Sequence, residues 1–168
     1  MRRTFILGIL AVFAMFSLFG CNNEATDSSS FTTKAAQGGM AEVQLGNLAL
    51  AKAQSADVKE FAQQMVTDHT KANNDLKNVA AKKSVALPTD INDQQKSTVE
   101  KLSKLSGADF DKRYVDAMVD DHEKDVKEFT AQAQGGTDPD VKAFAAKTLP
   151  TLQSHLDMIK GIKDRMMK

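Results

Sequence analysis

The sequence of 168 residues contains no tryptophan and a single tyrosine, Tyr114. Aromatic and β-branched residues are typical of strands, whereas the alanine and lysine that are frequent here favour helices. The composition therefore excludes a sheet-rich protein and predicts an all-α fold. After removal of a leader, the remaining length suits one domain.

Cysteine is also nearly absent: Cys21 is the only one, so no disulfide can form within the chain. Residues 1–20 begin with Arg2 and Arg3 and continue as an apolar run, which is typical of a secretory signal peptide. The run is shorter than the roughly 20 apolar residues that span a bilayer. We therefore expect an exported protein.

The residues Leu18-Phe19-Gly20-Cys21 resemble a bacterial lipobox. The resemblance implies a lipoprotein-type signal and a lipid anchor at Cys21, which would hold the protein in the cell envelope. In a Gram-negative cell it favours the outer membrane, facing the periplasm. The alternative is a plain signal peptide that leaves Cys21 as a free thiol. Residues 21–31 are small and polar and predict a disordered tether before a bundle domain at 32–168.

An excess of either charge is absent as well. The chain has 22 basic and 22 acidic residues, and without Arg2 and Arg3 the balance is 20 − 22 = −2. No basic cluster stands out, so nucleic acid is not an expected partner. The chain also lacks a glycine-rich phosphate loop, a Gly-x-Ser-x-Gly motif and a candidate catalytic cysteine. An enzyme is therefore not the favoured interpretation.

What the sequence does contain is helical periodicity. Spacings of four and three predict long helices around residues 35–56, 55–83, 107–136 and 139–166, with a shorter one at 91–105. The first has a seam of small residues that would pack closely against a neighbour. Ser55 and Asp138 are predicted N-caps, and Asp90-x-x-Asp93 resembles a capping arrangement. Pro150 predicts a kink or an irregular turn in the last helix.

All three histidines fall on these seams, one on each of three long helices: His69, His122 and His155. Glu42 occupies the equivalent place on the first. Glu42 and His69 lie about 14 and 13 residues from the turn between them, roughly 20 Å along their helices. His122 and His155 lie about 14 and 18 residues from Gly136, so all four come out near mid-bundle.

The chain resembles a family of exported bacterial proteins, domain of unknown function family 4142, over about residues 32–162. The likeness is carried by Glu42; Val58, Lys59, Phe61, Ala62, Met65, Val66, Asp68 and His69; Phe110, Asp111, Tyr114, Met118, Val119, Asp121 and His122; and Phe144, Ala145, Leu149, Pro150, Leu152, His155 and Leu156. It implies a ferritin-like four-helix bundle with a long crossover, and it implies no activity.

The wider ferritin-like class binds two irons through Glu-x-x-His pairs. Here Val66, Val119 and Leu152 stand three residues before the histidines, which argues against a di-iron centre. The first hypothesis is instead one transition metal such as copper, zinc or iron, bound by Glu42, His69, His122 and His155. Met65 and Met118 are possible additional ligands, since thioethers favour Cu(I), or they simply fill the core.

The second hypothesis is an envelope module that binds a partner or has a structural role without metal. Its histidines and Glu42 would form a buried polar network that Tyr114 or a neighbouring helix completes. A third is a bundle that responds to pH through its histidines. Asp68 and Asp121 point about 100° from their neighbouring histidines, so we expect them outside the direct ligand set. The sequence names no protein partner.

Overall fold

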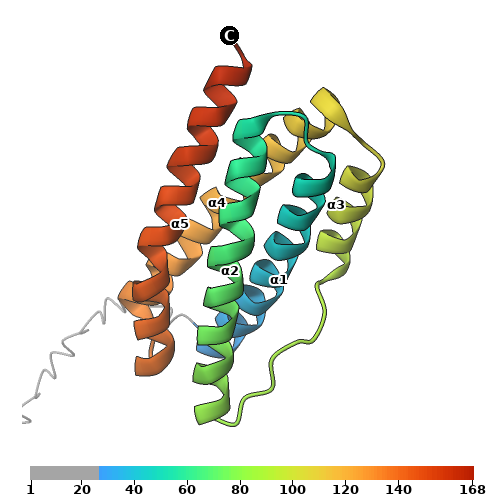
Figure 1. Ribbon diagram of the computed structural model, residues 1–168. Helices are drawn as coiled ribbons and strands as arrows, with labels where there is room; N and C mark the ends of the chain where they lie inside the picture. The colour runs from blue at the N-terminus through green and yellow to red at the C-terminus, as the bar shows by residue number, and fades with distance from the viewer. Residues whose placement is uncertain (1–26) are drawn as a thin grey trace, which may run out of the picture.

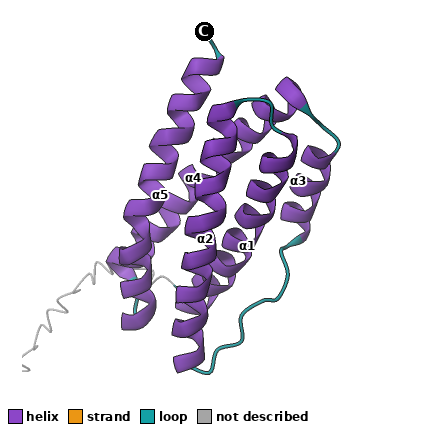
Figure 2. Ribbon diagram, viewed as in Figure 1, coloured by secondary structure: helices purple, strands orange, loops and turns teal. Residues whose placement is uncertain are grey.

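The computed structural model describes residues 27–168, and this part of the chain contains five helices and no strand (Figures 1 and 2). They are α1 (Ser28–Lys52), α2 (Ala56–Lys82), α3 (Asp93–Ser103), α4 (Gly107–Gly135) and α5 (Pro139–Met166). The predicted signal peptide at 1–20, the predicted lipid-anchor residue Cys21 and residues 22–26 of the predicted tether lie outside the described residues. No helix of the described part is long and apolar enough to cross a membrane.

Four of these helices form a bundle built from two hairpins. The helices α1 and α2 pair along their length, as do α4 and α5, and α2 also packs on α5. The crossover between the hairpins carries the short α3, which lies against α1 and α4 at one side of the bundle (Figure 1). The predicted ferritin-like four-helix bundle with a long crossover is confirmed.

The helix termini show where local sequence was sufficient and where it was not. Ser55 and Asp138 are N-caps as predicted, and Asp138 accepts hydrogen bonds from the backbone of Asp140 and Val141. The cap of α3 is Asn92, which forms a capping box with Gln95, so the predicted role of Asp90-x-x-Asp93 was wrong. Residues 139–166 form one unbroken helix through the exposed Pro150.

The bundle begins earlier than the sequence pattern predicts. Residues 28–31, assigned to the tether, are the first turn of α1, and Asp27 caps that turn by accepting from the backbone of Ser29. Phe31 explains the difference, because it is buried and packs edge-on against Phe129 of α4 with ring centroids 4.9 Å apart. One aromatic contact across the bundle therefore extends α1 into a polar segment.

The core consists of two apolar clusters separated by a polar layer. One cluster includes Leu45, Met65, Met118 and Ile159, and the other includes Phe31, Leu76, Phe129 and Leu152. Along all four long helices the break between the clusters falls at the same place. That place holds Glu42, His69, His122 and His155, all buried to 5% exposure or less.

Two glycines of α1 permit its close approach to α2. A Cβ atom on Gly46 would lie 2.8 Å from a methyl carbon of Val66, and one on Gly39 would clash with the side-chain amide of Asn73. The predicted small-residue seam therefore does allow close packing. Gly38 differs, since a Cβ atom there would meet nothing within 4 Å.

Asp111 is a buried carboxylate that stabilises the turn between α1 and α2 from a distance of 57 residues. It accepts hydrogen bonds from the backbone N–H groups of Gln54 at 3.1 Å and Ser55 at 2.7 Å. Only 3% of Asp111 is exposed. It binds the N–H groups at and just before the N-cap of α2, where the Ser55 side chain makes no cap hydrogen bond.

Replacing Asp111 with alanine is therefore expected to destabilise the protein by about 2 kcal/mol, because two backbone N–H groups lose a buried charged acceptor. Urea denaturation followed by circular dichroism measures the change. Asp109→Ala is the matched control, since Asp109 lies two residues before Asp111 on α4 but is exposed. Its loss should cost less than about 1 kcal/mol. Equal losses in the two variants would contradict the capping role of Asp111.

Candidate metal centre

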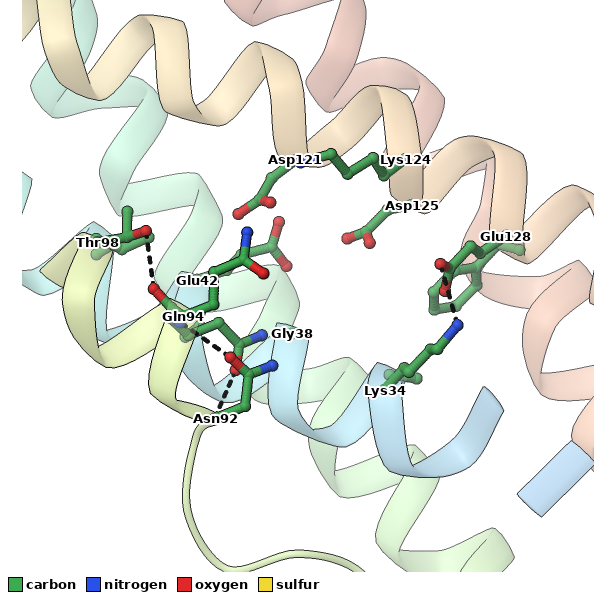
Figure 3. A pocket seen from close by; sticks show the side chains of 15 residues that line it. Lys34, Gly38, Glu42, Asn92, Gln94, Thr98, Asp121, Lys124, Asp125 and Glu128 are labelled. Atoms are coloured by element: carbon green, nitrogen blue, oxygen red, sulfur yellow. Dashed lines mark hydrogen bonds and ion pairs between the residues drawn. The ribbon is translucent and has the colours of Figure 1, made fainter. Parts of the chain in front are cut away.

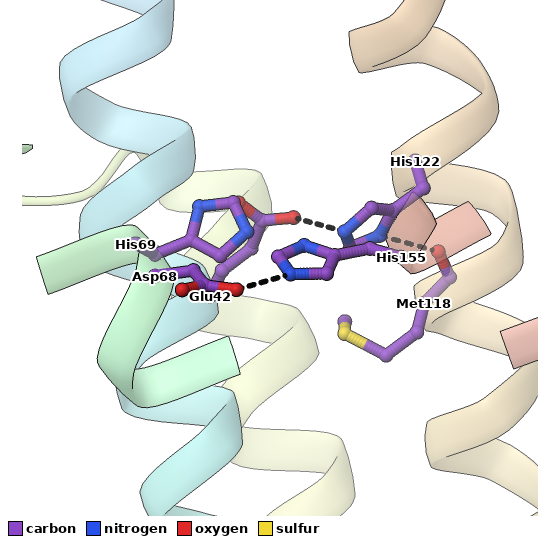
Figure 4. Close-up of polar contacts among 6 residues, drawn as sticks. All are labelled: Glu42, Asp68, His69, Met118, His122 and His155. Carbon is purple, nitrogen blue, oxygen red and sulfur yellow. Dashed lines mark hydrogen bonds and ion pairs between the residues drawn. The ribbon is translucent and has the colours of Figure 1, made fainter. Parts of the chain in front are cut away.

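The four polar side chains of the layer converge at the centre of the bundle (Figure 4). Glu42 binds Nδ1 of His69 at 2.8 Å through Oε2, and its Oε1 lies 3.6 Å from Nε2 of His122. The ring centroids of the three histidines are 5.4–5.9 Å apart. Each side chain comes from a different long helix, so the fold itself assembles the cluster.

One nitrogen of each imidazole is held by an oxygen. His69 Nδ1 pairs with Glu42, His122 Nδ1 lies 2.9 Å from the carbonyl oxygen of Met118, and His155 Nε2 lies 2.9 Å from Oδ2 of Asp68. Carbonyl and carboxylate oxygens only accept hydrogen bonds, so these three nitrogens carry the protons. The neutral rings therefore have their lone pairs on His69 Nε2, His122 Nε2 and His155 Nδ1.

These remaining nitrogens are buried and have no hydrogen-bond partner within residues 27–168. One ligand atom from each of the three rings can be chosen so that all lie within 4.8 Å of one another. Glu42 Oε1 is likewise buried and unpartnered. Lone pairs gathered in a buried interior cost free energy unless a hydrogen-bond donor or a cation lies among them.

Electrostatics determine which of these rings most readily takes a proton. Burial lowers the pKa of His122 and of His155 below the ordinary value of 6.5, which keeps both rings neutral at neutral pH. Burial also opposes charge on His69, but Glu42 outweighs it and raises the pKa of that ring. For Glu42, burial is outweighed by the three imidazoles, which lower its pKa. The layer therefore contains the Glu42 carboxylate, two neutral imidazoles and His69, which takes a proton more readily than the other two rings.

The donor set fits a transition metal. Three imidazole ligands leave an open position in a tetrahedral site, and hydrogen bonds from their other nitrogens to carboxylates or carbonyls orient the rings in such sites. Ligand nitrogens about 2.0–2.1 Å from one ion are about 3.3 Å apart. The ligand atoms, which lie within 4.8 Å of one another, would therefore approach by up to about 1.5 Å. Zinc, copper and iron all accept imidazole.

The other residues singled out in the sequence lie around this cluster in different ways. Met65 and Met118 are fully buried in the apolar cluster on one side of the layer, and Met118 contributes its backbone carbonyl to the layer. Tyr114 is buried, but its hydroxyl has no partner in the described chain, so it does not complete a network with the histidines. Asp68 lies outside the cluster of lone pairs and binds the far side of His155.

Two further carboxylates, Asp121 and Asp125, were not predicted as part of the site, and both point from α4 into a hollow that Glu42 also lines (Figure 3). Burial, followed by the charge of Glu42, raises the pKa of Asp121 to about 6. The same two causes raise the pKa of Asp125 well above its ordinary value. Asp125 escaped prediction because its four-residue spacing from Asp121 is common on solvated helix faces.

Asp121→Asn is expected to stabilise the protein by roughly 1–2 kcal/mol at pH 8, where the folded state disfavours the ionised carboxyl. As the pH falls through about 6, folded Asp121 takes up a proton while the unfolded chain stays ionised to about 3.8. Wild-type stability then recovers, and the gain should fade by about pH 4. Urea denaturation at several pH values tests this, with the exposed neighbour in Asp120→Asn as control. A gain independent of pH would contradict it.

Fold and site together define a class: a ferritin-like four-helix bundle with a buried histidine triad at its centre. The chain belongs to the family described as Domain of unknown function (DUF4142), whose model matches residues 21–162. The resemblance predicted from the sequence is confirmed. No curated protein matches the sequence.

Several solved structures share the fold. A DUF305 fragment from Deinococcus radiodurans has a TM-score of 0.73 at 15% identity and covers 84% of this chain and 98% of its own. CopM in its Cu(II)-bound form has a TM-score of 0.69 at 13% identity, covering 82% of this chain and 96% of its own. CopM in its Cu(I)-bound form has a TM-score of 0.68 at 14% identity. At these identities the likeness concerns the fold.

Proposed function

We propose that this chain binds one transition-metal ion through His69, His122 and His155 and serves metal handling or stress defence in the cell envelope. The observation that supports it most strongly is a cluster of three buried imidazoles, each with one unpartnered nitrogen, in which one ligand atom from each ring lies within 4.8 Å of the others. A core network selected only for structure would satisfy such nitrogens with donors. A cation satisfies all three at once.

Glu42 remains a candidate ligand in this proposal, as predicted from the sequence, and it also positions His69. Its Oε2 is engaged by His69, so it orients that ring and supplies negative charge, while Oε1 remains free to approach the ion. Asp68 and the Met118 carbonyl orient the other two rings. The three imidazoles leave one position open, which suits reversible binding of an ion.

Copper is the ion that we favour. The solved copper complexes of CopM show that this fold accommodates copper in that protein, and both of its oxidation states are represented. In this chain, imidazoles suit Cu(II), and the buried Met65 and Met118 supply polarisable sulfur beside the layer. The signal sequence and the lipobox resemblance at Cys21 suit a lipid-anchored role outside the cytoplasm.

The decisive measurement is metal content and affinity. Protein purified without chelator, or depleted and titrated with Cu(II), should hold one equivalent. Binding should release protons, because a ligand imidazole must be deprotonated and the pKa of His69 is raised. Tyr114 is the only tyrosine and tryptophan is absent, so its fluorescence reports quenching by Cu(II) inside the bundle. Substoichiometric metal that survives loss of His122 would overturn the proposal.

The alternative function is a metal-free envelope module in which the same residues form a polar network. The contact that favours it is the 2.8 Å pair between Glu42 and His69. It requires a second proton on His122, shared with Glu42 Oε1 across 3.6 Å. The lowered pKa of His122 opposes that proton, so this function ranks second.

A further inference from the structure

We propose that the hollow between α1, α3 and α4 is the port through which hydrated cations reach the histidine triad. The carboxylates of Asp121, Asp125 and Glu42 would bind the cation in turn along this path. This inference rests on the proposed metal function and adds the route of loading. The hollow has a volume of about 280 Å³ and opens between the crossover helix and the bundle (Figure 3).

The inner end of the hollow is marked by an unsatisfied group. Glu42 is 98% buried, yet it lines this hollow, and its Oε1 has no hydrogen-bond partner in the described part of the chain. The same oxygen lies 3.6 Å from the free nitrogen of His122. A cation that reaches Glu42 from the hollow is therefore already beside the triad.

A second, smaller cavity of about 20 Å³ continues inward to His69, which is enough room for about one water molecule. The two spaces share five residues of their walls: Ala35, Gly38, Glu42, Asp125 and Phe129. The shared residues therefore lie between the hollow and the space that His69 lines. The wall is thin at Gly38, where a Cβ atom would have nothing within 4 Å.

The charges suit passage of a cation rather than its storage. Four carboxylates line the hollow with two ammonium groups, and one of these, Lys34, is paired with Glu128 at 3.5 Å. Acidic clefts with low-dielectric walls concentrate cations and raise association rates. The carboxylates do not converge to metal-binding distances as the three histidines do. They therefore describe a path to a site.

The test is the rate of Cu(II) loading, followed by stopped-flow quenching of Tyr114 fluorescence. Gly38→Leu places an uncharged side chain in the shared wall, so it should slow association and dissociation by similar factors of about ten or more. The dissociation constant should change little, because a port alters the barrier and not the end states. Gly38→Ala is the control for added helix propensity and should load nearly as fast as wild type.

The charge is tested separately with Asp121→Asn combined with Asp125→Asn. At pH 8, where Asp121 is ionised, this variant should load about tenfold more slowly at low salt and lose most of the salt dependence of its loading rate. Asp120→Asn removes an equal charge from an exposed neighbour and should have little effect. If the wild-type protein binds copper and Gly38→Leu loads at the wild-type rate, the proposed entry route is wrong but the metal site is not.

If the wild-type protein binds no metal, the proposed metal site and the proposed entry route are both wrong.

Discussion

Replacing His122 with alanine is expected to abolish stoichiometric Cu(II) binding and the thermal stabilisation that accompanies it. The Nε2 atom of His122 is one of three unpartnered nitrogens in the cluster, and its removal leaves two imidazoles for the ion. Loss of an outer hydrogen-bond partner costs 10–100-fold in affinity, so loss of a ligand should exceed that.

The stabilisation itself has a predictable size. Metal at about 100 times its dissociation constant should add about 2.7 kcal/mol to wild-type stability, or roughly 10 °C in melting temperature. The His122→Ala protein should show almost none of this shift under identical conditions. Calorimetric scans with and without Cu(II) measure both.

Tyr114→Phe is the matched control for a buried change on the same helix. Tyr114 lies two turns before His122, is fully buried, and its hydroxyl has no partner among the described residues. Removing that hydroxyl should leave copper binding intact and should not destabilise the protein. A copper-induced shift that persists in His122→Ala, or that disappears in Tyr114→Phe, would contradict the assignment of the histidine triad.

The sequence was sufficient to predict how far along the bundle Glu42, His69, His122 and His155 lie, and that each faces the core. Spacings of four and three place His69 on the same helix face as Met65 and Leu76, and the core confirms that face. Because two hairpins of similar length pack in register, counting residues from their turns located the polar layer between the two apolar clusters. The helical periodicity gives the face of each residue, and the rise per residue gives its distance from the turn.

The pairings within the layer were beyond the sequence, because they depend on helix rotation and ring torsion. Asp68 meets His155 across 87 residues, and Asp111 caps a turn 57 residues away. Neither partner is marked by local spacing. The choice of which imidazole nitrogen faces inward is set by an acceptor on another helix, or by the Met118 carbonyl one turn away.

Glu42→Gln is the substitution that separates a metal site from a polar network. The glutamine carbonyl can still accept from Nδ1 of His69, and its amide can donate toward Nε2 of His122, 3.6 Å from the present Oε1. The metal-free protein at pH 8 should therefore change in stability by less than about 1 kcal/mol, since a buried charge is removed while both contacts are kept. Copper affinity should fall 10–100-fold, because the anion that orients His69 is lost.

A metal-free network predicts the reverse for the same protein. If Glu42 neutralised a protonated His122, removing the carboxylate would leave an uncompensated buried charge and cost about 3–5 kcal/mol. Urea denaturation without metal and copper titration with it distinguish the two outcomes, and Glu60→Gln on the exposed face of α2 controls for a lost carboxylate. In the metal-site hypothesis Glu42 stabilises the copper-bound protein. In the polar-network hypothesis it stabilises the metal-free protein. A large loss of metal-free stability with unchanged copper binding would favour the network.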